Sequence, residues 1–394
     1  MTTRIEQLLD GPPDPLFSWP ETVWISPLIE LYGFGVAARF DPGAGSSRYE
    51  TARRLVGEWW GERMVIGDGP GPFAFASFTF DPHASGSVVI VPETVLARTG
   101  SDAWLVLNGQ APDFHGATEP EAHPDRARFA GSSLPDHLWM EAVVEALDAI
   151  EAGVVEKVVL ARDHALWSKQ PFDPRRTLIR LHQQFPECFT FLIEGLVGAS
   201  PELLVGKEGL EVTSQVLAGS SRRAADPLED ETLGKELQTS AKNQLEHGLA
   251  ASSVGRVLGE VCRYLKRPGA PELLKLANVQ HLATRFEGTL DQPRHILDLV
   301  GALHPTAAVG GTPTEAAVGL IRRLEKMDRV RYAGPVGYFD GNGDGAFAIA
   351  LRCAELAGAR ARLFAGSGLV TGSVPEDELE ETRLKLRAML SALE

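Results

Sequence analysis

Five side chains in this sequence have a type and position that suit acid–base or metal chemistry. They are Lys157, Glu202, Glu246, Glu378 and Glu381. A neutral lysine amine can accept a proton from water, and a protonated carboxyl can donate one to a leaving group. Carboxylates on two helices can also hold Mg²⁺, which prefers oxygen ligands and keeps waters that substrate oxygens replace. These residues therefore permit acid–base catalysis beside a magnesium ion.

Lys157 interrupts VVEKVVLAR, residues 154–162, an aliphatic run typical of a strand covered on both faces. Because side chains alternate along a strand, Lys157 shares its face with Val155, Val159 and Ala161. This pattern has two interpretations. A lysine near a strand end can extend its ammonium group to water. Alternatively, a desolvated lysine can become a neutral base near neutral pH.

Glu202 and Glu246 each have a structural interpretation beside the chemical one. Glu202 follows a proline where the chain turns between two apolar runs, a position typical of a solvated turn residue. Glu246 shares a helical face with Leu249 and Val257, so that face is at least partly buried. Its structural role would be an ion pair with Lys242, one helical turn earlier.

The C-terminal segment SVPEDELEETRLKLRAML is a predicted helix that starts with a Ser373/Glu376 capping box. Its period places Glu378, Glu381 and Lys385 on one face. Acids in a first turn stabilise a helix through its dipole, which gives these glutamates a structural interpretation. In the other interpretation they join a carboxylate of another helix around Mg²⁺.

Several helices and strands are needed to bring these residues together. The helix LWMEAVVEALDAIEAG ends at Gly153 and leads into the lysine strand. Residues 231–267 form the longest helical pattern, stopped by Pro268. Residues 1–136 contain many Gly and Pro residues between short apolar runs. Since no repeat or low-complexity linker is found, we expect this part to add strands to a shared core.

A glycine motif near the C-terminus, GSGLVTG, spans Gly366 to Gly372 and resembles a dinucleotide-binding loop. Its third glycine comes one residue late and no acidic strand end follows, so a Rossmann site is not expected. A Gly-x-Gly turn at Gly366 and Gly368 would still leave backbone N–H groups free for an anion.

The composition limits the class of protein. The 394 residues are 44% hydrophobic and 23% charged, enough for one large α/β domain or two smaller ones. No export signal and no membrane span is predicted, so we expect a cytoplasmic protein. The net charge of -15, without a cluster of Lys and Arg, argues against a nucleic-acid partner. An anionic substrate would need local positive charge.

Ten ordered sequence blocks carry a resemblance to a known family. They are EKVVLAR, GASPELLV, VLAGSSRR, LEHGL, HLATRFEG, LHPTAAVGGTP, GPVGYFD, FAIALRC, LFAGSGLV and ETRLKL. Between about Leu138 and Leu390 the chain resembles the chorismate-utilising enzymes, and most closely their isochorismate synthase branch. The first 130 residues match weakly.

The resemblance implies a Mg²⁺-dependent, reversible isomerisation of chorismate to isochorismate. Water attacks C2 of the ring, and the C4 hydroxyl leaves as the ring double bonds migrate. Lys157 aligns with the general base of the family and Glu202 with the general acid. Glu246 and Glu381 align with the magnesium ligands, and Glu378 with an outer acid that reaches metal-bound water.

The resemblance also implies a set of substrate-binding residues. Arg352 aligns with the arginine that pairs with the enolpyruvyl carboxylate. Backbone N–H groups around Gly366 and Gly368 lie beside it. Gly219 and Ser220 line the side of the ring carboxylate, so an acidic protein can bind a dianionic substrate.

A few positions separate the branches of the family. Relatives that use ammonia have glutamine where this chain has Lys157. Salicylate synthases keep the lysine but tend to carry threonine and then alanine where this chain has Ala308 and Val309. We therefore predict an isochorismate synthase, with salicylate synthase as the alternative. The resemblance leaves open whether the product serves menaquinone, a catechol siderophore or salicylate made by a separate lyase.

The fold implied is an α/β (α+β) arrangement of two packed, mostly antiparallel sheets flanked by helices. We expect one chorismate-binding domain over residues 1–394, with its catalytic region at 137–394, in a monomer. A non-catalytic binding subunit with the same fold is a competing hypothesis. The complete set of base, acid, metal ligands and arginine argues against it, since a non-catalytic member could lose any of them and still fold.

Overall fold

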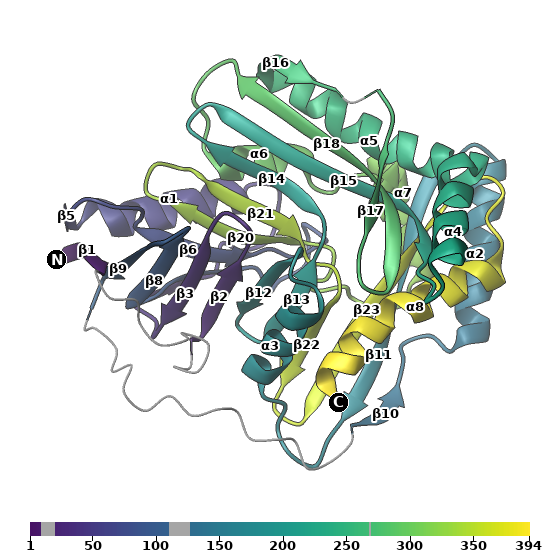
Figure 1. Ribbon diagram of the computed structural model, residues 1–394, viewed down its shortest axis with the longest axis horizontal. Helices are drawn as coiled ribbons and strands as arrows, with labels where there is room; N and C mark the ends of the chain where they lie inside the picture. The colour runs from purple at the N-terminus through teal and green to yellow at the C-terminus, as the bar shows by residue number, and fades with distance from the viewer. Residues whose placement is uncertain (9–19, 110–126, 268) are drawn as a thin grey trace.

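The computed structural model describes residues 1–8, 20–109, 127–267 and 269–394 (Figure 1). Two large β-sheets, A and B, form its centre. The helices are α1 (Arg48–Gly61), α2 (Asp136–Glu151), α3 (Pro174–Gln184), α4 (Pro227–Thr239), α5 (Ala241–Val261), α6 (Ile296–Leu303), α7 (Thr314–Leu324) and α8 (Pro375–Leu393).

Sheet A combines strands from both ends of the chain. In spatial order it contains β10 (Arg128–Gly131), β11 (Lys157–Trp167), β23 (Arg360–Leu369), β22 (Cys353–Ala357), β13 (Leu196–Ser200), β12 (Phe189–Ile193), β2 (Thr22–Ile25), β3 (Glu30–Phe34), β8 (Thr94–Thr99), β9 (Asp102–Leu107), β1 (Thr2–Leu8) and β5 (Met64–Ile66), with β19 (Gly311–Thr312) beside β11. Its described strand pairs are antiparallel except β1 with β5.

Sheet B has the same mixed origin. Its strands are β16 (Cys262–Lys266), β18 (Val279–Leu290), β15 (Glu211–Arg222), β14 (Leu203–Glu208), β21 (Gly345–Ile349), β20 (Pro335–Asp340), β6 (Phe73–Ser77), β7 (Val88–Val91) and β4 (Ala38–Phe40), with β17 (Glu272–Lys275) beside β18. The predicted class, two mostly antiparallel sheets flanked by helices, is confirmed. That residues 1–394 form one domain stays a prediction, although strands from before and after residue 136 lie side by side in both sheets.

Sheet A is covered on both faces because its strands alternate apolar side chains between two cores. In β12, Phe191 and Ile193 belong to the core shared with sheet B, while Leu192 belongs to the core under α3 and α8. In β2, Trp24 belongs to the core shared with sheet B and Val23 to the core under α3 and α8. Period-2 alternation of this kind packs two sheets together and leaves the outer face for helices.

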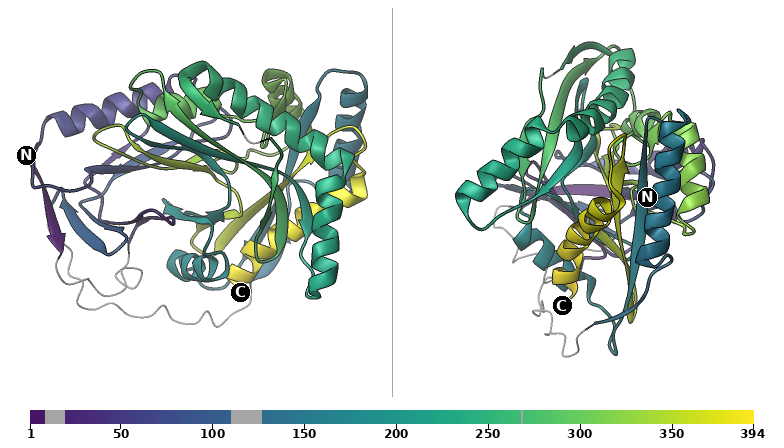
Figure 2. Two further views of the ribbon diagram at one scale, coloured as in Figure 1. Left: turned by 45° about the horizontal axis from the view of Figure 1, so that its top comes forward. Right: turned by 90° about the vertical axis from the view of Figure 1, so that its right-hand side faces the viewer.

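The two helices that carry the candidate carboxylates, α5 and α8, pack on different sheets. Helix α5 packs on β15 and β18 of sheet B, and α8 packs on β23 of sheet A (Figure 2). In the described part of the chain, no helix is long and apolar enough to cross a membrane.

Two predictions about helix boundaries are wrong. The helical pattern over 231–267 is divided at Ser240, whose backbone is extended and whose hydroxyl accepts a hydrogen bond from Asn243 N–H. Serine is a favoured N-cap, so the chain starts a new helix there. The second helix gives way to β16 at Cys262, before the proline. The predicted capping box is absent, because Val374 is the N-cap residue of α8 and makes no side-chain cap.

Candidate active site

Most of the predicted site residues line one pocket at the junction of the two sheets. They are Glu202, Gly219, Ser220, Glu246, Ala308, Val309, Arg352, Gly366 and Gly368. Lys157, Glu378 and Glu381 lie outside this lining, and Glu378 pairs with Lys242, which is not a lining residue either. Lys157 pairs with Glu246, and Glu381 pairs with Lys385, which also lines the pocket. The structure thus brings the predicted residues together.

Glu202 and Arg352 lie where the chain crosses from one sheet to the other. Glu202 lies between β13 of sheet A and β14 of sheet B, and Arg352 lies between β21 and β22. Arg352 has a φ of 47°, in the left-handed region that few residues other than glycine adopt. Backbone strain of this kind is found where a side chain must take a required direction.

Glu202 is a buried carboxyl, so its interpretation as a solvated turn residue is wrong. It is 3% exposed and makes no ion pair among the described residues. Burial raises the pKa of Glu202 to about 8, against the opposing charges of Lys157, Lys385 and Arg352. Desolvation disfavours the charged carboxylate more than those cations favour it. At neutral pH, Glu202 therefore holds a proton that it can donate.

Arg352 is connected to the glycine of LAGS through a histidine that the sequence analysis did not assign. Arg352 Nη2 donates to His281 Nε2 at 3.0 Å, so the ring carries its proton on Nδ1. Nδ1 lies 3.2 Å from Gly219 O and 3.1 Å from Ser220 Oγ. Burial, with the charge of Arg352, lowers the pKa of His281 to about 3. A neutral histidine thus orients both sides of the pocket.

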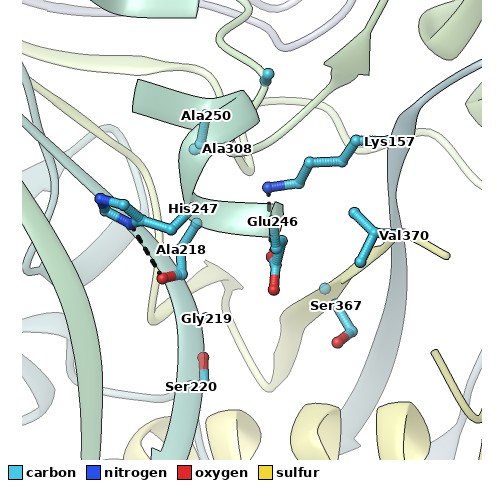
Figure 3. Close-up of polar contacts among 12 residues, drawn as sticks. Lys157, Ala218, Gly219, Ser220, Glu246, His247, Ala250, Ala308, Ser367 and Val370 are labelled. Carbon is cyan, nitrogen blue, oxygen red and sulfur yellow. Dashed lines mark hydrogen bonds and ion pairs between the residues drawn. The ribbon is translucent and has the colours of Figure 1, made fainter. Parts of the chain in front are cut away.

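Gly219 forms a bulge in β15 beside this histidine. The pairing of β15 with β18 shifts between Ala218 and Ser220, and Gly219 has a φ of +75°. Such a bulge uses glycine because the left-handed region costs it little. Next to it, His247 Nδ1 donates to Ala218 O at 3.2 Å (Figure 3). Gly219 and Ser220 of this bulge both line the pocket.

Lys157 is fully buried at the start of β11, so the interpretation that it extends to water is wrong. Its Nζ lies 3.3 Å from Oε1 of Glu246 and makes no hydrogen bond within the described residues (Figure 3). Glu246 therefore pairs with Lys157, whereas an ion pair with Lys242 does not form. Gly368 makes room for the pair, because a Cβ there would lie 2.1 Å from Glu246 Oε1.

Gly366 and Gly368 lie inside β23, so their prediction as a turn is wrong, although they still present backbone donors. Gly366 pairs with Ala161 and Gly368 with Val159 of β11. Gly366 O accepts from Lys385 Nζ at 2.9 Å and so points away from β11. In an antiparallel strand the N–H of a residue points the same way as its C=O. The N–H groups of both glycines therefore face the pocket side.

The pKa values of the two glutamates of α8 shift in opposite directions. Glu378 is 1% exposed and accepts from Lys242 Nζ at 2.6 Å, while Glu381 accepts from Lys385 Nζ at 2.6 Å. Burial, followed by the charge of Glu381, raises the pKa of Glu378. Burial also opposes ionisation of Glu381, but the charges of Lys385 and Lys242 outweigh it and hold its pKa well below the usual range. Glu381 is thus an anion.

The carboxylates fit a magnesium ion only as a partial set of ligands. Among the described residues, no group of three or more His, Cys, Asp and Glu side chains is close enough to hold a metal by itself. Mg²⁺ is usually held by one or two carboxylates together with waters and substrate oxygens. Glu246 on α5 and Glu381 on α8 are two carboxylates of this kind, and each lies against a lysine.

His281 and Tyr332 are pocket residues that the sequence did not single out, and Lys242, expected to pair with Glu246, pairs with Glu378. Tyr332 lines the pocket and stacks on Phe364 with 5.0 Å between ring centroids. The block HLATRFEG begins at His281, and GPVGYFD begins shortly after Tyr332, so the sequence did carry a signal for these two residues. Alone, a histidine or a tyrosine in an apolar strand is more often a structural residue.

Comparison with known proteins identifies the class. Residues 113–394 match the family described as chorismate binding enzyme. The chain is 34% identical to the isochorismate synthase MenF of Bacillus subtilis, covering 94% of this chain and 87% of that protein. It is 38% identical to the isochorismate synthase EntC of Escherichia coli, covering 93% of each. This protein therefore belongs to the chorismate-binding enzyme family.

A solved structure agrees with this assignment. The crystal structure of DhbC from Bacillus anthracis superposes with a TM-score of 0.84 at 30% identity, covering 96% of this chain and 98% of that one. The similarity thus includes the N-terminal strands, which the sequence blocks matched weakly.

Proposed function

We propose that this protein is an isochorismate synthase, which adds water at C2 of chorismate and removes the C4 hydroxyl. The observation that carries the proposal is the contrast between Glu202 and the Lys157–Glu246 pair. Glu202 is a buried carboxyl with a raised pKa, and the Lys157–Glu246 pair holds a buried amine in the same region. The named isochorismate synthases among the relatives support the same activity.

Lys157 would act as the general base on the attacking water. Its buried Nζ makes no hydrogen bond within the described part of the chain, which would leave the nitrogen free to bind a water molecule. In the neutral state the amine accepts a proton from that water as the oxygen attacks C2. General base catalysis of this kind contributes roughly 10² to 10⁴ in rate.

Glu202 would act as the general acid on the leaving group. Hydroxide is a poor leaving group, so the C4 oxygen must be protonated as its bond to carbon breaks. The carboxyl of Glu202 is protonated at neutral pH because burial raises its pKa to about 8. One hydroxyl enters and another leaves at the same oxidation level, so the reaction is close to balanced and reversible.

Glu246 and Glu381 would hold Mg²⁺, with Glu378 reaching a metal-bound water. When bound, the ion would neutralise the ring carboxylate of the substrate and hold it in place. On the enzyme side, Lys242 and Lys385 keep Glu378 and Glu381 in position on α8.

The remaining pocket residues would bind the two carboxylates and the ring. Arg352 supplies a buried guanidinium for the enolpyruvyl carboxylate, with the N–H groups of Gly366 and Gly368 beside it. Gly219 and Ser220 would contact the ring-carboxylate side. The small side chains Ala308 and Val309 would form the wall next to the ring.

The product distinguishes this function from its alternative, salicylate synthase. Salicylate forms only if the enolpyruvyl group is held so that its methylene carbon takes the C2 hydrogen, which demands close alignment. Purified protein is incubated with chorismate and Mg²⁺, and the products are identified by NMR. We expect isochorismate as the principal product, and no aminated product when ammonium is added.

Two results would change the assignment. Salicylate and pyruvate appearing as fast as chorismate disappears, without an added lyase, would establish a salicylate synthase. Unchanged chorismate would contradict both activities and favour a non-catalytic binding subunit. Lys157→Ala, treated in the same way, controls for the uncatalysed decay of chorismate.

A further inference from the structure

Beside the pocket, the buried ion pair of Glu325 and Arg329 lies against a stretch of β11 that has no neighbouring strand among the described residues. Along one edge, β11 pairs with β19 at Lys157 and Val158, and with β10 from Ala165 onward. Between these stretches, no strand of the described chain pairs with this edge. The backbone groups of Val159 and Ala161 that face the gap therefore need other partners.

Val159 N–H donates to Gly310 O, and Ala161 O accepts from Trp139 Nε1. Glu325 and Arg329 bind the other two groups. Arg329 Nη2 donates to Val159 O at 2.7 Å, and Ala161 N–H donates to Glu325 Oε1 at 2.7 Å. Arg329 Nε donates to Glu325 Oε2 at 2.9 Å. The two side chains expose only 3% and 1% of their surface. The pair thus continues the hydrogen-bonding edge where β19 ends.

The same guanidinium also holds a wall of the pocket. Its Nη1 donates to Val309 O at 2.8 Å, and both Arg329 and Val309 line the pocket. Its Cζ lies 4.1 Å from the centroid of the Phe80 ring, a contact that restricts the guanidinium plane. One planar group therefore spans Val159 and Val309 and sets the distance between β11 and the wall.

We propose that Arg329, held by Glu325, is a positioning residue that fixes the Val309 wall relative to the strand of Lys157. The inference rests on the proposed function, in which Lys157 is the base and Val309 contacts the ring. A misplacement of about 1 Å can cost on the order of 10²-fold in rate. Because Arg352 binds the substrate independently, loss of the bridge lowers kcat more than it raises KM.

The chain offers a matched control two residues away. Arg331 is also a buried arginine that pairs with a glutamate, Glu355, at 3.3 Å. It also donates to two backbone carbonyls, those of Ile193 and Glu194, both at 3.0 Å. Arg331 does not line the pocket. The two arginines therefore share a structural role and differ in their contact with the site.

Arg329→Lys and Arg331→Lys are compared in the full-length protein. Lysine keeps the charge but cannot bridge two carbonyls as the planar fork does. We expect a similar loss of Tm in both. We expect kcat to fall on the order of 10²-fold in R329K with little change in KM, because the wall is misplaced, and to stay at the wild-type value in R331K.

Hydrogen exchange provides a readout that does not depend on activity. R329K is expected to speed exchange in peptides covering 304–312 and 159–162, and R331K in peptides covering 193–195. If the wild-type protein did not turn over chorismate, the proposed function would fail while this exchange result could still support the bridge. Unchanged exchange over 304–312 in R329K, or an equal loss of kcat in both variants, would overturn the inference.

Glu325→Gln and Glu355→Gln decide the question if a lysine variant does not fold. Glutamine keeps an oxygen that can accept from Ala161 N–H and from the arginine, so both proteins are expected to fold. We expect a lower kcat and faster exchange over 304–312 in E325Q but not in E355Q. The same changes in both variants would make the pair merely structural.

Discussion

The site places buried glutamates in two regions with opposite surroundings. Glu202, at the junction of the sheets, is 3% exposed and has no ion pair among the described residues. On α5 and α8, Glu246, Glu378 and Glu381 each lie against a lysine. Glu246 and Glu378 are buried to a similar degree, at 6% and 1%. Burial alone therefore does not distinguish the two regions.

A comparison of Glu202 with Glu381 shows that direct contact with a cation decides the direction of their pKa shifts. Lys157, Lys385 and Arg352 act on Glu202 only at a distance. Desolvation therefore outweighs their charges and raises the pKa of Glu202 to about 8. Glu381 accepts directly from Lys385, and its pKa falls. Glu378 differs, because burial and the charge of Glu381 raise its pKa although it accepts from Lys242. Under the proposed function, the same residue type would provide a proton donor in one region and an anionic metal ligand in the other.

Removing the metal should produce the largest effect, because only the helix region is expected to bind it. Excess EDTA is expected to abolish turnover, and added Mg²⁺ to restore it. Glu246→Gln and Glu381→Gln should lose most activity and bind Mg²⁺ more weakly in calorimetry, since an amide carries no charge to attract the ion.

The matched variant in the other region is Glu202→Gln, which should retain the Mg²⁺ affinity of the wild type. Circular dichroism confirms that each variant folds. Full activity in excess EDTA would contradict the assignment of the α5 and α8 carboxylates, and equal loss of affinity in all three variants would erase the contrast between the regions.

The proton-transfer variants should show the next largest effect. Lys157→Ala removes the base and Glu202→Gln removes the acid, so each is expected to lower kcat by roughly 10² to 10⁴. The measurement is the steady-state rate with saturating Mg²⁺. Lys235→Ala serves as the control, because Lys235 belongs to an exposed pair on α4 with 69% of its side chain accessible. Wild-type turnover in Lys157→Ala would leave this lysine with a structural role alone.

The sequence could predict the elements whose signals are local. The aliphatic run at Lys157 became β11, and the helix ending before Gly153 became α2. Both depend on periodicity and on glycine, which act within a few residues. The division at Ser240 could not be predicted in the same way, because the helical pattern continues on both sides and only the serine marks the new start.

The partners of the site residues depend on contacts between distant parts of the chain. The sequence suggests an ion pair of Glu246 with Lys242, four residues away, but Glu246 contacts Lys157 on β11 of sheet A. Gly366 and Gly368 suggested a turn by their spacing, whereas close approach of Glu246 requires the second glycine inside β23. The resemblance to a family named the residues of the site, but their ion pairs and burial came from the fold.

The pH dependence of kcat/KM should give the smallest effect. It tests whether Glu202, unlike the helix carboxylates, acts as a protonated acid. A general acid works while it is protonated, and the pKa of Glu202 is raised to about 8 in the free enzyme. The protonated fraction is therefore nearly complete at pH 6 and falls about tenfold for each pH unit above 8. We expect kcat/KM to follow this decline on the alkaline side. Glu202→Gln should show low activity without that decline, because glutamine does not titrate. An unchanged alkaline decline in Glu202→Gln would assign it to another group and remove Glu202 as the acid.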